Sequence, residues 1–106
     1  MNTYTDDQLK QALAKMLPDI VEVFTVKDSP EIVLVEAETG TQYRDTELLH
    51  LCWMVEETLT NSQTVSYYCA LNDLVEITTF PQWAKVHATW QQRVIALCNV
   101  KGVDIV

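Results

Sequence analysis

The most direct candidates for chemistry are the histidines and the acidic residues near them. His50 lies three residues after Glu47 and seven before Glu57, spacings that place all three on one face of a helix. Such a face could bind a metal ion, but zinc normally takes four ligands, and a solvated polar helix face explains the same pattern. The other histidine, His87, stands just before an expected helix start, where a hydrogen bond or simple exposure suffices. We therefore predict no metal and no cofactor.

Covalent catalysis by a cysteine and a histidine would require the two side chains to be in contact. Cys52, Cys69 and Cys98 each fall on or beside an apolar helical face, so we interpret them as small, reduced core residues. No serine stands in a G-x-S-x-G elbow. Gly40 and Gly102 are isolated, which excludes a glycine-rich phosphate loop of the usual type. We predict no catalytic residue and interpret the protein as a non-enzyme.

Aromatic side chains are more suggestive. Large rings dominate buried area, so most of them belong in the core. Trp83 and Trp90 flank a short segment after Phe80 where the core pattern is weakest, and exposed rings beside acidic groups mark interfaces. The candidate partner-binding residues are therefore Phe80, Trp83, Trp90, Glu47, His50 and Glu57. They could mediate homodimerisation or hold a basic protein partner.

The formal net charge of −8 comes from fifteen acidic and seven basic residues. An acidic surface repels phosphate, so direct nucleic-acid binding is disfavoured, whereas a basic partner is attracted. The first residues have neither a basic start nor an apolar run, and no stretch approaches the roughly 20 apolar residues that span a bilayer. We predict a cytoplasmic protein without membrane contact.

Local signals predict four helices. Their starts are marked by residues that can cap a helix N-terminus: Thr5, Asp45 or Thr46, Thr60 and Thr89. The three T-x-x-Q steps among them match the capping box, in which the first and fourth residues bond to each other's backbone. Pro18 ends the first helix, and Gly102 suits the position after the last, where φ is often positive.

Two β-branched segments, residues 20–26 and 31–36, flank a turn and predict an antiparallel hairpin. Residues 83–88 could form a third strand. Residues 32–35 are apolar on both faces, whereas a sheet with one wet face alternates, so we expect helices on both sides of the hairpin. The prediction is one α/β (α+β) domain over residues 1–106, a three-layer α/β/α sandwich with about three strands and four helices. A two-layer α+β arrangement is the main alternative.

Two segments carry a family resemblance. The helix containing Leu48-Leu49-His50, Val55-Glu56 and Leu59 resembles the histidine- and glutamate-bearing helix of the phage ABA sandwich domain family. The passage His87-Ala88-Thr89 followed by Gln92-Arg93 is similar to that family's final strand-to-helix step, although Trp90 replaces a small residue. The resemblance covers roughly residues 45–102 and not residues 1–44. It implies a phage or prophage origin and a helix–sheet–helix sandwich, and it carries over no catalytic residues.

Two classes of function fit these features best, and an enzyme is the third choice. The first is a small acidic, phage-type binding protein that engages a host or phage protein, for example an anti-defence inhibitor that occupies the basic groove of a nucleic-acid-binding enzyme. The second is a binder of a small molecule such as a nucleotide signal, which needs a pocket between subunits or between helices and sheet. Acidity, small size and spare aromatic residues favour the first.

Overall fold

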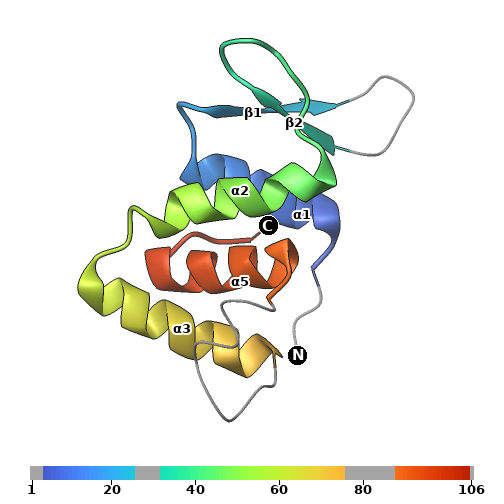
Figure 1. The fold of residues 1–106 in the computed structure, drawn as a ribbon. Coiled ribbons are helices and arrows are strands. Elements are labelled where there is room, and N and C mark those ends of the chain that lie inside the picture. Colours follow the sequence, from blue (N-terminus) through green and yellow to red (C-terminus); the bar gives the residue numbers. More distant parts are fainter. Residues whose placement is uncertain (1–3, 26–31, 76–87, 106) are drawn as a thin grey trace.

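The structure is a computed structural model of the 106-residue chain, and it describes residues 4–25, 32–75 and 88–105. These residues form an α+β arrangement of four helices and one two-stranded antiparallel sheet (Figure 1). In chain order the elements are α1 (Asp6–Met16), β1 (Val21–Thr25), β2 (Ile32–Glu36), α2 (Asp45–Glu56), α3 (Asn61–Val75) and α5 (Trp90–Lys101). No helix within the described ranges is long and apolar enough to cross a lipid bilayer.

The predicted capping boxes are present. At the start of α1, the Gln8 amide donates to the Thr5 hydroxyl at 3.2 Å, and the Thr5 amide donates to the Gln8 side chain at 2.8 Å. The same reciprocal pair joins Thr89 to Gln92 before α5. A box of this kind satisfies two amides that the first helical turn leaves without backbone partners.

The start of α2 differs from the prediction. Neither Asp45 nor Thr46 caps the helix, because Arg44 is the N-cap residue and Asp45 is already helical. The Arg44 amide donates to the Glu47 carboxylate at 3.1 Å. Glu47 therefore satisfies one free amide from inside the helix, and the acidic first turn complements the positive end of the helix dipole.

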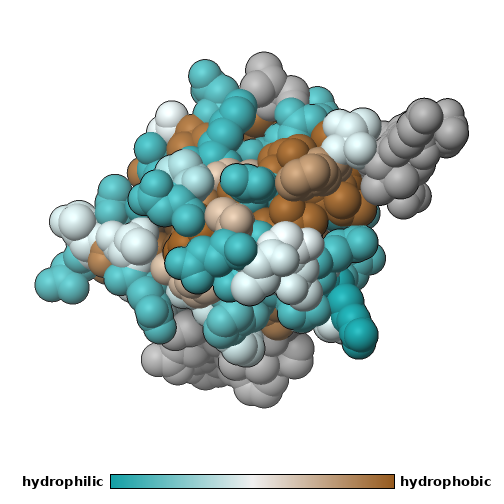
Figure 2. All heavy atoms as spheres, turned by 90° about the horizontal axis from the view of Figure 1, so that it is seen from above, coloured by the Kyte–Doolittle hydropathy of each residue, from teal (hydrophilic) through white to brown (hydrophobic). Residues whose placement is uncertain are grey.

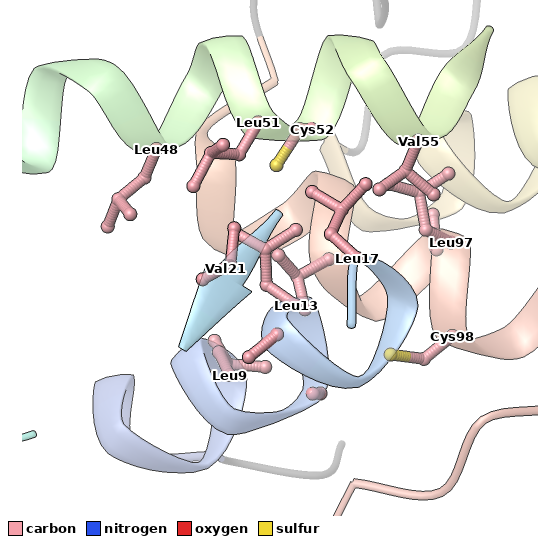
Figure 3. Close-up of a cluster of buried hydrophobic side chains, with 14 of the residues drawn as sticks. Leu9, Leu13, Leu17, Val21, Leu48, Leu51, Cys52, Val55, Leu97 and Cys98 are labelled. Carbon is pink, nitrogen blue, oxygen red and sulfur yellow. The ribbon is translucent and has the colours of Figure 1, made fainter. Parts of the chain in front are cut away.

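The core lies between the helices, and α5 packs against α1, α2 and α3 (Figure 1). Helix α1 contributes Leu9 and Leu13, which recur at helical spacing and are almost fully buried. They meet apolar residues of α2 and α5 (Figure 3), and the labelled cluster comprises Leu9, Leu13, Leu17, Val21, Leu48, Leu51, Cys52, Val55, Leu97 and Cys98. The apolar residues of the first, second and last helices thus meet in one core.

The hairpin is antiparallel, as predicted, with Val23 opposite Leu34 in the register. Helix α1 packs against both strands. It also satisfies the backbone of Ile32, whose amide donates to Asp7 at 3.2 Å and whose carbonyl accepts from Lys10 at 3.4 Å. These contacts anchor β2 to the first half of α1.

The expected cover on both faces of the hairpin is not confirmed along β1. Leu34 and Val35 are both buried, but Phe24 is 52% exposed and Val23 is 41% exposed. Viewed from the hairpin side, a brown hydrophobic area lies beside the grey residues in an otherwise mostly teal surface (Figure 2). The predicted third strand, residues 83–88, lies outside the described residues except for Ala88. The three-strand, three-layer arrangement therefore stays a prediction.

Candidate binding site between α2 and α3

A short turn places the end of α2 beside the first turns of α3. Helices α2 and α3 pack on α5 and are joined by residues 57–60 (Figure 1). The Thr58 hydroxyl donates to the Val55 carbonyl at 2.7 Å, and Thr60 forms the predicted capping box with Gln63. A hollow of about 400 Å³ opens at this corner, lined by Trp53, Glu56, Glu57, Leu59, Thr64, Tyr67 and Tyr68.

Three aromatic rings line this hollow at different depths. Trp53 is 48% exposed, Tyr68 is half-buried and Tyr67 is buried. The Tyr67 and Tyr68 rings lie 5.9 Å apart at an interplanar angle of 37°. His50, one turn before Trp53 on α2, meets the indole in a T-shaped contact with the ring centroids 6.3 Å apart. The hollow thus combines one widely exposed indole with two tyrosines set further into the protein.

The two glutamates of the hollow have different environments. Glu56 is held by Arg93, whose Nη1 donates to both of its carboxylate oxygens at 3.1 and 3.4 Å. The Arg93 side chain is only 3% exposed, and its Nε donates to the Ala88 carbonyl at 3.3 Å. Adjacent helical residues point about 100° apart, so Glu57 faces elsewhere and is exposed. Glu57 makes no ion pair within the described ranges, which leaves one uncompensated negative charge at the hollow.

The tyrosine and the thiol nearest to the two glutamates, Tyr67 and Cys52, have raised pKa values. Burial raises the pKa of Tyr67 far above its usual value, and the Glu56 carboxylate raises it further, while Arg93 opposes both. The raised pKa keeps the Tyr67 hydroxyl protonated near neutral pH. Burial likewise raises the pKa of the Cys52 thiol to about 12. Neither group adds negative charge near neutral pH, so Glu57 is the acidic residue without an ion pair among the described residues that line the hollow.

The cysteines follow the predicted core role in two of three cases. Cys52 and Cys98 are buried, and the Cys52 thiol donates to the Trp90 carbonyl at 3.7 Å. Cys69 is exposed, so its interpretation as a core residue was wrong. It stands on α3 next to Ala70, on the side of the helix turned away from the buried Tyr67 and Leu71.

The structure brings some of the predicted partner-binding residues together. His50 on α2 and Glu57, the C-cap residue of α2, are exposed, and Glu47 is exposed at the start of the same helix. Trp90 is half-buried and packs against the core, so only part of its ring can meet a partner. Phe80 and Trp83 lie outside the described residues.

Trp53 and Tyr68 are the site residues that sequence reasoning missed. Trp53 follows His50 by three residues and precedes Glu57 by four, so helical spacing alone places it on their face. The general expectation that large rings are core residues obscured this signal. Tyr68 carried no comparable signal, because its place beside Trp53 depends on the angle between α2 and α3.

Other parts of the described structure offer less to a ligand. No three His, Cys, Asp or Glu side chains of the described residues converge as a metal site requires. A larger open hollow of about 740 Å³ lies between α3, α5 and the segment after α5. Among the described residues, its lining includes Asp73 and Asp104 but no lysine or arginine. These two carboxylates would repel a phosphate, which disfavours a nucleotide in this hollow.

No family model matches the chain, and comparisons with curated proteins and with solved structures found no similar protein. The resemblance to the phage ABA sandwich domain family therefore stays a prediction. The two segments that carry it are nevertheless in contact, because Glu56 belongs to one of them and Arg93 to the other.

Proposed function

We propose that this protein is a non-enzymatic binding protein that holds a basic segment of a protein partner at the hollow between α2 and α3. The observation that carries the proposal is the pairing of an exposed indole, Trp53, with an exposed carboxylate, Glu57, one helical turn apart in the same hollow; Glu57 makes no ion pair with any residue that the structure describes. Aromatic faces and carboxylates both attract cations, so the two groups act on the same ligand.

The energetics of such a site suit recognition of a partner. A cation over an aromatic ring contributes about 0.5–1 kcal/mol at an exposed site and about 2 kcal/mol when desolvated. Tryptophan and tyrosine are enriched among the residues that dominate interface affinity. The overall charge of −8 adds long-range attraction for a basic partner, which raises the association rate.

The same features disfavour the alternative of a nucleotide-signal binder. The carboxylates at both hollows repel phosphate, and the guanidinium of Arg93 is engaged by Glu56 rather than open to a ligand. A small cationic molecule remains compatible with the hollow between α2 and α3, but an extended basic segment also uses the acidic surface around it.

Several finer predictions attach to this proposal. The protein would be of phage origin and act in the cytoplasm of the host cell. Its partner would be a host defence enzyme whose nucleic-acid-binding groove is basic. A third strand from residues 83–88 would complete the layered sandwich. Homodimerisation would bury the exposed Val23 and Phe24 of the hairpin.

A titration with a defined basic peptide tests the proposal. The probe is a short synthetic peptide with equal numbers of lysine and arginine in a Gly/Ser background, followed by calorimetry at low and high salt. We expect binding that weakens as salt rises, because screening acts on exposed charges. Glu57→Gln should weaken it more than the control Glu22→Gln, which removes the same charge from the exposed hairpin. Equal effects of the two variants, or no binding by the wild type, would contradict the proposal.

A further inference from the structure

The chemistry of the hollow discriminates between the cationic side chains that a basic partner can offer. We infer that the group it holds is an arginine guanidinium, stacked on the Trp53 indole and paired through its edge with the Glu57 carboxylate. This inference rests on the proposed function and adds the identity of the recognised group.

The spacing of Trp53 and Glu57 fits a planar cation. The two residues are four apart, and Glu57 is the C-cap residue of α2 and keeps helical backbone angles, so their Cβ atoms lie about 5–6 Å from each other on the same side of the helix. A guanidinium that lies flat on the indole directs its N–H groups sideways, in the plane of the cation, where a neighbouring carboxylate can accept two of them. One ligand group can thus satisfy both side chains at once.

An ammonium group makes poorer use of this arrangement. The lysine ammonium is compact and strongly hydrated, and its donors do not form a planar fork that matches a carboxylate. It can approach the indole or the carboxylate, but it gains little from both together. Arginine is also the more frequent partner of aromatic rings in cation–π contacts.

A methylated ammonium is also disfavoured, because its recognition requires several aromatic faces around the methyl groups. Among the described residues that line this hollow, Trp53 alone offers a widely exposed ring. Tyr67 is 1% exposed, and Tyr68 is half-buried. The hollow therefore resembles a stacking platform beside a carboxylate rather than an enclosing cage.

The protein already contains a guanidinium–carboxylate pair next to this position. Arg93 pairs with Glu56 from the buried side of α2, and Glu56 directly precedes Glu57 in the chain. Because Arg93 already engages Glu56, an entering arginine has Glu57 as its available acceptor. The internal pair also fixes the last turn of α2 and thereby the backbone that carries Glu57.

Three peptides that differ in one side chain test the inference. Each is a short Gly/Ser peptide with a single central arginine, lysine or trimethyllysine, and binding is followed by the indole N–H signal of Trp53 in ¹⁵N–¹H spectra, assigned with Trp53→Phe. We expect the arginine peptide to bind on the order of tenfold more tightly than the other two. Glu57→Gln should abolish most of this preference, whereas the control Glu22→Gln should retain it.

The possible outcomes separate this inference from the proposed function. If the lysine or trimethyllysine peptide shifts the Trp53 signal with equal or higher affinity, arginine selectivity is refuted while binding of a basic partner stands. If the arginine preference persists in Glu57→Gln, the assigned pairing is refuted. If none of the three peptides shifts the Trp53 signal, both the inference and the proposed site are refuted.

Discussion

Arg93 and Glu56 form a buried ion pair, with Nη1 of Arg93 3.1 Å from one carboxylate oxygen of Glu56 and 3.4 Å from the other. The side chains are 3% and 13% exposed. The pair joins the start of α5 to the end of α2, and Arg93 also binds the Ala88 carbonyl before α5. It therefore fixes the backbone at the edge of the hollow that holds Trp53 and Glu57.

Removing one member of this pair should destabilise the protein. Arg93→Met leaves the Glu56 carboxylate buried without its cation, and breaking a buried pair in this way costs roughly 3–5 kcal/mol. We expect a loss of about 3 kcal/mol in the free energy of unfolding, measured by urea denaturation. The double variant Arg93→Met with Glu56→Leu should recover part of the loss, because no unpaired charge remains. A single variant as stable as wild type would show that the pair contributes nothing.

The core position Leu13 should be sensitive to truncation. Its side chain is fully buried between α1 and the other elements of the cluster (Figure 3), so Leu13→Ala removes apolar contacts and leaves a cavity. The free energy of unfolding should fall by about 2–5 kcal/mol. Val65 on α3 is 64% exposed and serves as the control, since Val65→Ala should change stability by less than about 0.5 kcal/mol. Equal losses from both substitutions would refute the assigned core.

We predict that the free energy of unfolding falls at alkaline pH because two thiols are buried. Burial raises the pKa of Cys52 to about 12 and that of Cys98 to about 11, compared with 9.0 for an unperturbed thiol. Above pH 9 the unfolded chain loses these protons while the folded chain keeps them, so their contribution is complete below pH 9 and declines as pH rises toward 11 and 12. The urea midpoint should fall over this range, and less steeply in Cys52→Ala. An identical slope in that variant would contradict the prediction.

A thiol reagent supplies the control for that experiment. In the native protein at mildly alkaline pH, only the exposed Cys69 should react rapidly, whereas all three cysteines should react in urea. Cys69→Ser should remove the rapid reaction without changing the alkaline loss of stability. Rapid native reaction of Cys52 would show that its surroundings are open to solvent.

The sequence by itself determined the features that depend on neighbours three or four residues apart. Thr5, Thr60 and Thr89 each bond to the glutamine three positions later, and a helix start needs nothing beyond that local geometry. Gly102 follows α5 in the left-handed conformation, with φ of 71°, for an equally local reason. The hairpin followed from two β-branched segments around a short turn.

Only the tertiary structure decided the pairing of Arg93 with Glu56, which are 37 residues apart, and the exposure of Trp53 beside Tyr68. The helical period placed Trp53 with His50 and Glu57, but it could not tell whether that face meets solvent or another helix. That depends on how α2 and α3 pack on α5, because burial is set by contacts between segments that are distant in the chain. For the same reason, the apolar residues 32–35 of one strand could not show whether a helix covers the other strand, in which Phe24 is exposed.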